Sequence, residues 1–447
     1  MPVLEGEKRA DVVVVGGGYT GMWAAWHAKA LEAEARVVLL EADRCGRGPS
    51  GRNGGFCEAM WQSLPTMRER WGDAASLTVG RAAERAVEAI GAFCDSQGVD
   101  AWFRRAGYLQ VSTAAAHDGA WDGALAACHE LGVAGAVQPL LPAEVAARCA
   151  SPAFRAGVLY PNVATVQPAR LALGLRDRLL ATGVEVCEGS PVRRLRTAGA
   201  GVEAETAGGL VRAERAVVAI GGAAKAPHGP LRDALTVTSS HIVLTEPVPD
   251  LLEEIGWTGG ECITDSRTLV DYFRTTPDGR IAFGWGGGRI EMGARLRGRA
   301  ELDRAVVEGA IARLREYFPG LAGRRLTHAW GGPIDVSPSH LPVIVPLAGD
   351  RAFAAAGYTG NGVGPSHMVG RALASLALDR RDEHSRLAFV DPAPPRVPPE
   401  PFHWLGGEVI RRALLRKENA ELAGEDPSFI SAAISKVPSL IGFHIGR

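Results

Sequence analysis

A glycine-rich turn near the start of the chain constrains the fold more than any other feature. The valine run Val12–Val15 leads directly into Gly16, Gly18 and Gly21 at G-x-G-x-x-G spacing, and a helical stretch follows. A second apolar run then ends on Glu41. Consecutive valines are typical of a buried parallel strand. Together with an acid at the end of the second strand, the glycine spacing predicts a dinucleotide-binding unit.

Each residue of this unit has a physical role. Gly16 permits the tight turn, Gly18 lets the backbone approach a pyrophosphate, and Gly21 lets the helix pack on the strand. The helix N-terminus offers free N–H groups and the positive end of its dipole to phosphates. Glu41 would accept hydrogen bonds from a pair of ribose hydroxyls. A glycine turn in another kind of α/β protein is the alternative, and the order of the elements disfavours it.

A second glycine-rich stretch follows, from Gly46 to Gly55. Its five glycines in ten residues favour backbone that lies close to a flat or charged partner, with a flexible surface loop as the alternative. Within it, Ser50-Gly-Arg-Asn-Gly-Gly55 resembles the S-G-R-N-G-G stretch of gamma-glutamylputrescine oxidoreductase and similar amine-oxidising flavoproteins. The chain is therefore similar to the FAD-dependent oxidases and dehydrogenases of the D-amino-acid-oxidase type.

This resemblance implies an α/β fold of the D-amino-acid-oxidase/glutathione-reductase-2 type. A Rossmann-like FAD-binding domain would be joined to a discontinuous second domain, an α+β substrate domain. We expect the FAD-binding domain to comprise residues 1–73, 155–235 and 328–392, and the substrate domain to comprise 74–154 and 236–327. Residues 393–447 would form a proline-rich arm and a C-terminal helical tail, which could pack on the body, on a second subunit or at a membrane surface.

Apolar spacing supports this order of elements. It predicts helices over 19–34, 74–96, 114–131, 142–149, 168–182, 302–318 and 404–422. A hairpin is expected over 202–212 with Gly208-Gly209 as its turn. Strands are expected over 101–112, 183–187, 216–220, 236–246, 268–284 and 352–356.

The resemblance also implies which residues hold noncovalent FAD. They are Gly16, Gly18, Tyr19, Thr20, Gly21, Glu41, Ala42, Ser50, Gly51, Arg52, Asn53, Gly54, Val192, Gly221, Gly222, Gly357, Thr359, Gly360, Asn361, Gly362 and Val363. In the family pattern, backbone at Val192 meets the adenine and Gly221-Gly222 lies near the diphosphate, although a plain strand-to-loop turn is the alternative there. The helix after Gly362 would direct its N-terminus at the flavin and stabilise developing negative charge. Asn361 stands where the family commonly has histidine.

Candidate residues for chemistry come from the same resemblance. Asn53, Tyr272 and His340 are the expected catalytic residues, because an amide or hydroxyl near the flavin can donate and accept hydrogen bonds. The expected substrate-binding residues are Tyr272, Arg274, His241, Trp330 and Tyr358. The alternatives are ordinary: aromatic side chains in a sheet are usually core, a histidine is more often structural than catalytic, and Asn53 could simply hold a left-handed turn.

Several residues of the family pattern are missing. Ile334 stands where amino-acid-oxidising relatives carry an arginine, with Asp335 beside it, so bidentate recognition of a substrate carboxylate is unsupported there. Residues 333–370 contain no cysteine and residues 48–55 no histidine, which favours FAD without a covalent tether. Residues 268–288 contain no lysine to activate oxygen, so the electron acceptor stays open.

The predicted function is therefore FAD-dependent oxidation of a C–N bond in a small primary or secondary amine. A hydride would pass to flavin N5, and the imine would hydrolyse to an aldehyde plus an amine or ammonia, with oxygen as the expected acceptor. Three alternatives stay open. One is action on an amino acid, aminophosphonate or hydroxy acid with Arg274 or Arg289 as the carboxylate partner. The others are a dehydrogenase with another acceptor and a flavoprotein that only relays electrons.

Composition excludes other classes. A net charge of −1 gives no reason to expect a nucleic-acid partner. Seven scattered cysteines without ligand spacing predict no metal site and favour reduced thiols in a cytoplasm. The start of the chain has no apolar signal region, and no apolar run is long enough to predict a membrane span. The oligomeric state stays open.

Overall fold

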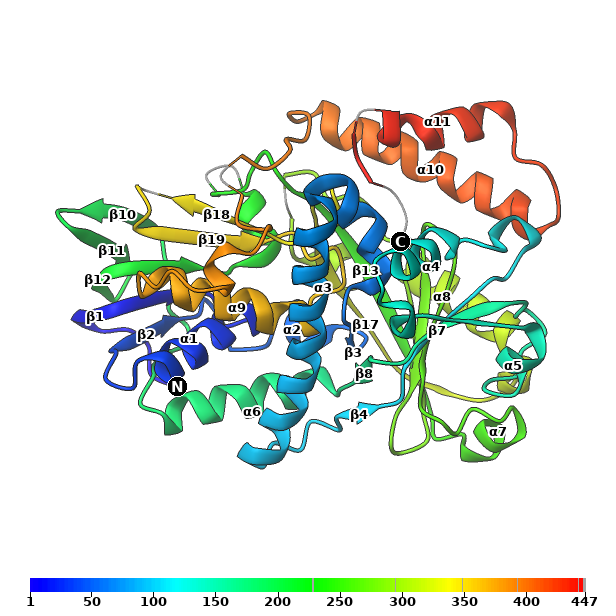
Figure 1. Cartoon of the computed structure of the whole chain (residues 1–447), viewed down its shortest axis with the longest axis horizontal. Helices are drawn as coiled ribbons and strands as arrows, with labels where there is room; N and C mark the ends of the chain where they lie inside the picture. The colour runs from blue at the N-terminus through cyan, green and yellow to red at the C-terminus, as the bar shows by residue number, and fades with distance from the viewer. Residues whose placement is uncertain (227–228, 294, 348, 392, 441, 445–447) are drawn as a thin grey trace.

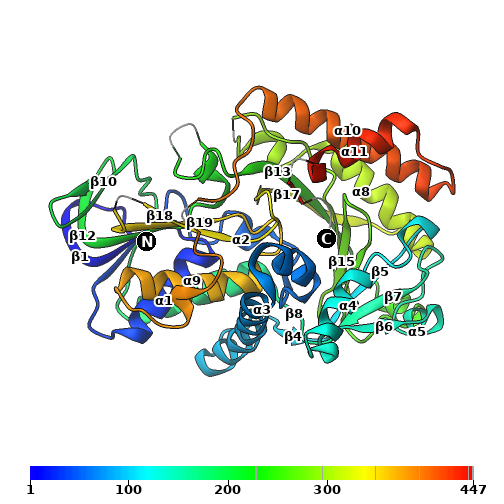
Figure 2. The same cartoon turned by 45° about the horizontal axis from the view of Figure 1, so that its top comes forward.

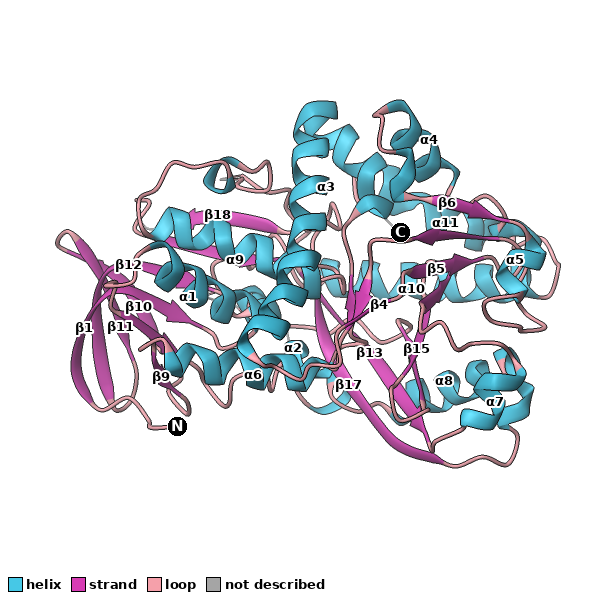
Figure 3. Cartoon of the chain, turned by 60° about the horizontal axis from the view of Figure 1, so that its bottom comes forward, coloured by secondary structure: helices cyan, strands magenta, loops and turns pink. Residues whose placement is uncertain are grey.

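The computed structural model describes residues 1–226, 229–293, 295–347, 349–391, 393–440 and 442–444. Two large sheets lie side by side along the longest axis, and helices cover them (Figures 1 and 3). The first sheet contains the glycine turn of the N-terminus. In spatial order it runs β10 (Arg194–Ala198), β11 (Gly201–Glu205), β12 (Gly209–Val218), β1 (Gly6–Val15), β2 (Val37–Leu40) and β9 (Glu185–Cys187), with β19 (Ala352–Ala356) on β12 and β18 (Val343–Leu347) on β19.

Parallel pairing in the first sheet brings distant glycine segments to one edge. β1 pairs in parallel with both β2 and β12, and β12 pairs in parallel with β19. The carboxyl ends of these four strands therefore meet at the same edge of the sheet, where α/β folds bind their ligands. Gly16, Glu41, Gly221 and Gly357 follow these ends, so the expected Rossmann-like arrangement is confirmed.

Helices α1 (Tyr19–Leu31) and α9 (Val363–Ala377) pack against one another on this sheet. Gly370 permits their close approach, because a Cβ there would lie 2.6 Å from the Cβ of Trp23. Helix α3 (Leu64–Gln97) crosses α9 and is interrupted at Gly72, which has a φ of +75°. Helix α6 (Pro168–Ala181) covers α1 from another side.

The second sheet is built largely from antiparallel strands. Its order is β17 (Leu326–Val336), β13 (Thr236–Thr245), β16 (Ile281–Trp285), β15 (Asp271–Thr275), β14 (Cys262–Asp265), β5 (Tyr108–Val111), β7 (Gly157–Tyr160) and β6 (Gln138–Leu140). Helix α8 (Arg304–Tyr317) packs on β13 and β16. An aromatic cluster that includes Phe273, Phe283 and Tyr317 fills the space between helix and sheet.

Short elements connect the two sheets. A small sheet joins β3 (Phe56–Cys57), β8 (Ala164–Thr165) and β4 (Arg104–Arg105). The four-residue helix α2 (Pro49–Arg52) contacts both α6 and β17. The remaining short helices are α4 (Asp122–Glu130), α5 (Pro142–Ala146) and α7 (Pro249–Glu254).

Three elements lie elsewhere than the expected domain ranges imply. Most of α3 falls in the range given to the substrate domain, but its buried residues belong to the core of the first sheet. Strands β7 and β17 begin in or near ranges given to the FAD-binding domain, yet both pair within the second sheet. The physical reason is that the apolar face of a helix and the hydrogen-bond partners of a strand decide which sheet it joins. The position of the element in the sequence does not decide this. The remaining division into domains stays a prediction.

The C-terminal part forms a helical hairpin on the body (Figure 2). Helix α10 (Phe402–Leu422) agrees closely with the predicted helix, whereas α11 (Phe429–Leu440) was not predicted. Arg411 of α10 donates hydrogen bonds to the carbonyls of Gly287 and Gly288 at 2.7 and 2.8 Å. The tail therefore packs on the body. Among the described helices, none combines the length and apolar character needed to cross a bilayer.

Candidate active site

A cavity of about 1000 Å³ opens between the carboxyl edge of the first sheet and one face of the second. Its walls come from the turn after β1, the end of β2, α2 and its flanking loops, the segment before β10 and the loop after β12. Strands β13, β15 and β17 and the loop before α9 complete it. This volume is at the upper end of the range for ligand sites and suits a dinucleotide with a small molecule beside it.

Two helix N-termini open on the cavity. Helix α1 begins after Gly18 and α9 after Gly362, and neither N-cap residue provides a side-chain hydrogen bond. Both caps line the cavity. The positive dipole ends of both helices therefore face the cavity, where an anionic ligand can bind.

The glycine turn has the geometry that the spacing predicts. Gly16 has a φ of +109°, and a Cβ there would lie 2.3 Å from the carbonyl oxygen of Ala219. At Gly21 a Cβ would lie 2.0 Å from the carbonyl oxygen of Gly16, so this glycine permits the contact of helix and strand. A side chain at either position would clash with backbone atoms, which cannot move away as a flexible side chain could.

Glu41 ties the end of β2 to this turn. Its Oε2 accepts a hydrogen bond from the backbone N–H of Gly17 at 2.7 Å, and its Oε1 accepts one from that of Asp43 at 2.8 Å. The residue also lines the cavity. Each carboxylate oxygen has a further lone pair, so the same side chain can organise the turn and accept from a ribose hydroxyl.

The second glycine stretch is fastened to α1. Ser50 Oγ accepts a hydrogen bond from the backbone N–H of Tyr19 at 2.9 Å. The Asn53 amide donates to the carbonyls of Pro49 and Ser50 at 3.0 and 2.9 Å, and its Oδ1 accepts from Gly55 N–H at 2.8 Å. These bonds direct the amide into its own loop, and the residue lines the cavity, so the contact of Asn53 with a flavin ring stays a prediction.

The alternative for Asn53 needs correction. The residue has a φ of −76°, so it does not hold a left-handed turn. The positive φ values in this stretch, +76° and +80°, fall on Gly46 and Gly55. Asn53 therefore stabilises the loop through hydrogen bonds and not through a special backbone conformation.

Tyr272 on β15 faces the cavity between two glycines. A Cβ at Gly54 would lie 2.9 Å from its ring, and one at Gly284 would lie 2.1 Å from it. Its hydroxyl oxygen is 2.7 Å from Ser240 Oγ, which donates to the carbonyl of Trp285 at 2.9 Å. Because the single Ser240 proton is used there, the Tyr272 hydroxyl donates to Ser240 and can accept from a molecule in the cavity.

Three predicted substrate residues do not line the cavity. Arg274 Nε donates to the carbonyl of Gly54 at 2.6 Å, and burial lowers its pKa to about 10. His241 is fully buried, with Nε2 2.9 Å from the backbone nitrogen of Asp303, and burial lowers its pKa. Trp330 Nε1 donates to the carbonyl of Arg52 at 2.9 Å. All three support the cavity wall from behind.

Tyr358 and His340 do line the cavity. The Tyr358 hydroxyl lies 2.7 Å from Thr20 Oγ1, and burial raises its pKa. The His340 ring contacts that of His444, with 5.1 Å between centroids. His444 comes from the C-terminal tail. Its backbone N–H donates a hydrogen bond to the carbonyl of Pro338 at 2.8 Å, which holds the residue at the cavity. Sequence reasoning missed His444, because no local pattern places a tail residue at a cavity.

Ile334 and Asp335 on β17 both line the cavity. Asp335 Oδ2 accepts a hydrogen bond from the N–H of Gly357 at 2.6 Å, and its carbonyl accepts from Thr359 N–H at 2.9 Å. Burial raises the pKa of Asp335 to about 6. The carboxyl group therefore holds the loop that leads into α9, which sequence reasoning did not foresee.

Most of the predicted cofactor residues share this cavity. Those that line it are Gly16, Gly18, Tyr19, Thr20, Glu41, Ala42, Ser50, Arg52, Asn53, Gly54, Val192, Gly221, Thr359, Gly360, Asn361, Gly362 and Val363. Gly21, Gly51, Gly222 and Gly357 lie behind the wall. Gly51 is an example: it packs against other backbone instead of facing the cavity, and a Cβ there would lie 2.1 Å from the carbonyl oxygen of Gly46.

Other wall residues were not predicted. They include Glu58, Pro191, Arg193, Arg194, Ser240, Arg297 and Glu301. Arg193 and Arg194 directly follow Val192, which was predicted to contact the cofactor. This adjacency in sequence was the one signal that could have identified them as cavity residues. Ser240 and Glu301 reach the site only through the folding of the second sheet.

A family model described as FAD dependent oxidoreductase matches residues 11–376. Among curated proteins, the chain is similar to "Probable oxidoreductase OrdL" of Rhizobium meliloti (strain 1021), with 28% identity over 439 residues, 93% of this chain and 91% of that protein. It is also 28% identical to gamma-glutamylputrescine oxidoreductase of Escherichia coli (strain K12) over 409 residues, 90% of this chain and 89% of that protein.

Solved structures share the fold. Glycine oxidase from Geobacillus kaustophilus has a TM-score of 0.68 and 20% identity, over 84% of this chain and 96% of that one. L-proline dehydrogenase from P. horikoshii has a TM-score of 0.68 and 18% identity, over 87% and 96%. At these identities the likeness shows the architecture alone.

Proposed function

Because the chain belongs to the family of FAD-dependent oxidoreductases, we propose that it oxidises a C–N bond in a small primary or secondary amine. The amine loses two electrons and two protons to become an imine, which water hydrolyses to an aldehyde and an amine or ammonia. Molecular oxygen is the proposed final acceptor. The similarity to gamma-glutamylputrescine oxidoreductase supports this class of substrate.

The cavity wall fits FAD along its length. Glu41 would accept from the adenosine ribose, and Val192 would contact the adenine. The N-terminus of α1 would face the diphosphate. The α2 loop and the N-terminus of α9 would hold the flavin, where the α9 dipole favours negative charge. When bound there, FAD would act as the two-electron acceptor of the oxidation, with flavin N5 as the proposed hydride acceptor.

One observation carries the choice of an amine over an α-amino acid. The two arginines that the sequence suggested as carboxylate partners, Arg274 and Arg289, are engaged elsewhere and do not line the cavity. Arg274 donates to the carbonyls of Gly54 and Thr275, and Arg289 pairs with the carboxylate of Asp303 at 3.1 Å. With Ile334 in the wall, that position offers an α-carboxylate no arginine, and neither Arg274 nor Arg289 is placed to replace it.

The residues that do face the cavity suit a neutral amine. The Tyr272 hydroxyl can accept a hydrogen bond from a substrate N–H group, since its own proton is donated to Ser240. The aromatic ring, packed between Gly54 and Gly284, makes that part of the wall apolar. Arg297, exposed at the cavity, could bind an anionic group that lies far from the reacting nitrogen.

The test is an anaerobic substrate panel. The FAD-loaded protein is mixed with amines and with their α-carboxylated counterparts, and bleaching of the long-wavelength flavin band is followed. We expect the amines to give the higher kcat/KM. If a simple α-amino acid gives the highest value, the proposal is wrong. Reoxidation in air, compared with that by an artificial acceptor, tests the role of oxygen.

A further inference from the structure

The C-terminal hairpin exposes an unusual share of the apolar side chains. In the described chain, eight of the fifteen large apolar side chains that are exposed lie in α10 and α11. They are Phe402, Leu405, Val409, Leu422, Phe429, Ile430, Val437 and Leu440. Single exposed apolar residues are ordinary on soluble proteins, but a concentration of them marks a surface that is covered by something else.

Helix α11 is amphipathic, but its apolar side faces outward and its small and polar side faces the protein. Its buried residues are Ser431, Ser435 and Pro438. Its outward residues include Phe429, which is 86% exposed, and Leu440, which is 81% exposed. A helix that packs on a soluble protein normally turns its apolar side inward. Here the small and polar side faces the protein, so the apolar side is available to an apolar environment.

Helix α10 continues this surface with positive charge. Phe402, Leu405, Val409, Arg412 and Arg416 follow one another at spacings of three and four residues, which places them on one side of the helix. The three apolar residues and the two arginines are all exposed. We call the exposed residues of α10 and α11 the hairpin face.

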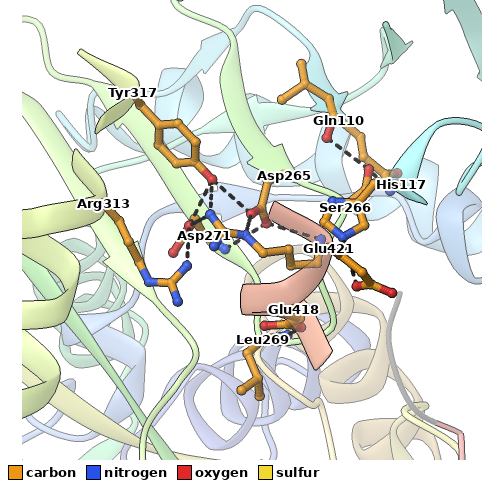
Figure 4. A network of polar contacts seen from close by, with 12 residues as sticks. Gln110, His117, Asp265, Ser266, Leu269, Asp271, Arg313, Tyr317, Glu418 and Glu421 are labelled. Carbon is orange, nitrogen blue, oxygen red and sulfur yellow. Dashed lines mark hydrogen bonds and ion pairs between the residues drawn. The ribbon is translucent and has the colours of Figure 1, made fainter. Parts of the chain in front are cut away.

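The acidic residues of α10 are turned inward, and Figure 4 shows two of them, Glu418 and Glu421. Glu408 and Glu418 accept hydrogen bonds from the backbone N–H groups of Ile290 and Leu269, at 3.1 and 2.9 Å. Glu421 lies 3.4 Å from His117, with both side chains buried. These contacts fasten α10 to the body and remove its negative charge from the surface.

The charges that remain exposed on the two helices have one sign. They are Arg412, Arg416 and Lys436. The exposed acids nearby lie in the flanking loops and not on the helices: Glu400 precedes α10, and Glu425 and Asp426 connect α10 to α11. A surface of large apolar side chains with cations among them is the composition of helices that lie in the interface of an anionic bilayer.

We propose that the hairpin face docks on the surface of a bilayer that contains anionic lipid. The apolar side chains enter the boundary between headgroups and acyl chains, and the three cations contact lipid phosphates. A second copy of this chain is the less suitable partner. A two-fold interface would pair the face with itself and bring its three cations against three more, with no acid exposed on the helices themselves to neutralise them.

The inner side of α10, opposite the hairpin face, lies beside one wall of the cavity. Arg411 holds the carbonyls of Gly287 and Gly288, and Gly286 and Arg297 on either side of this segment line the cavity. Docking would therefore place one wall of the cavity close to the lipid surface.

The test is co-sedimentation of the FAD-loaded protein with vesicles. One set is phosphatidylcholine alone, and the other contains phosphatidylglycerol as well. We expect binding to the anionic vesicles that weakens as salt is added. The double variant Phe429→Gln/Ile430→Gln should lose at least about tenfold in vesicle affinity, from the lost apolar contact. The triple variant Arg412→Gln/Arg416→Gln/Lys436→Gln should lose about as much and show little dependence on salt.

A matched control uses an exposed leucine elsewhere. Leu141 is 69% exposed and far outside the hairpin in sequence, so Leu141→Gln should leave vesicle affinity unchanged. All variants should keep their flavin content and their amine oxidation in solution, which shows that they are folded. Failure of the folded wild type to bind anionic vesicles would overturn the proposal. So would equal binding by all variants, or a wild-type dimer that Phe429→Gln/Ile430→Gln separates without any vesicle binding.

Discussion

At the scale of single residues, Glu41 combines a structural and a ligand-binding task. Its two oxygens accept from the N–H groups of Gly17 and Asp43. Glu41→Ala removes both bonds and the acceptor for a ribose hydroxyl. We expect FAD affinity to fall by roughly ten- to a hundredfold, which corresponds to about 1.5–3 kcal/mol, with the fold retained.

The measurement is titration of apoprotein with FAD by flavin fluorescence. Glu41→Gln is the control, since it keeps one carbonyl acceptor and should lose less affinity than Glu41→Ala. An unchanged dissociation constant in Glu41→Ala would place the ribose acid elsewhere.

Asn53 tests whether a loop is held by hydrogen bonds or by backbone conformation. The amide makes three bonds to backbone within its own loop, and the residue has a negative φ. Asn53→Gly and Asn53→Ala should therefore behave alike, each weakening FAD binding through the loosened loop by about 1–3 kcal/mol. Normal FAD affinity in Asn53→Gly combined with a loss in Asn53→Ala would contradict this role.

Tyr272→Phe separates a hydroxyl from its ring. The ring keeps its edge-to-face contact with Phe56, 6.0 Å between centroids, so folding and FAD binding should be unaffected. Loss of the hydroxyl should lower kcat/KM for amines by roughly two- to tenfold. Tyr108→Phe is the control, because its hydroxyl bonds to Thr264 in the same sheet away from the cavity. Equal kinetic effects in both variants would argue against a substrate contact.

At the scale of elements, α10 is fastened by a carboxyl group that titrates near neutrality. Burial raises the pKa of Glu418 to about 7, and Asp265 raises it too, whereas Leu269 N–H, Arg267 and Lys417 oppose the shift. Between about pH 4.5 and 7 the folded protein holds a proton that the unfolded chain has released. The stability of the folded state therefore falls as the pH rises through this range, by up to about 3 kcal/mol.

Glu418→Gln keeps an acceptor for Leu269 N–H and removes the titration. We expect the variant to be more stable than the wild type at pH 8 and similar to it near pH 4.5, as measured by urea unfolding at both values. Glu400→Gln, at an exposed acid just before α10, is the control and should not alter the dependence on pH. A wild type with flat stability across this range would refute the assignment.

The helices and strands also show which elements the local sequence pattern can predict. Helices α6, α8 and α9 and the hairpin of β11 and β12 agree with the predictions from apolar spacing and turn residues. Helix α11 escaped prediction because it has apolar residues on its outer side and serines inward, so a search for an inward apolar stripe does not find it. Helix α3 was found, but its packing on the first sheet depends on α9.

At the scale of the whole molecule, the cofactor site lies between two sheets and closes only when both are in place. FAD that binds this folded arrangement should raise the melting temperature by several degrees at saturation. None of the seven cysteines lines the cavity. Acid denaturation should therefore release flavin into the supernatant. Flavin that stayed with the precipitate would contradict noncovalent binding and direct attention to His340 and His444, which do line the cavity.

The sequence by itself determined the dinucleotide turn, the acid at the end of β2 and the loop from Ser50 to Gly55. These features depend on backbone conformation and on contacts between neighbouring elements, so residue type and spacing are sufficient to recognise them. The parallel order of the first sheet then followed, because the chain segments that carry these signals must meet at one edge.

Only the tertiary structure decided which side chains face the cavity. Tyr272 and Arg274 lie on the same face of β15, but the backbone of Gly54 and Gly55 covers the arginine. Ser240 reaches the cavity while His241, the next residue, points to the other face of the sheet, because side chains alternate along a strand. His444 enters from the far end of the chain. A sequence shows the period of a strand, whereas the face that meets the ligand is set by what packs on either side.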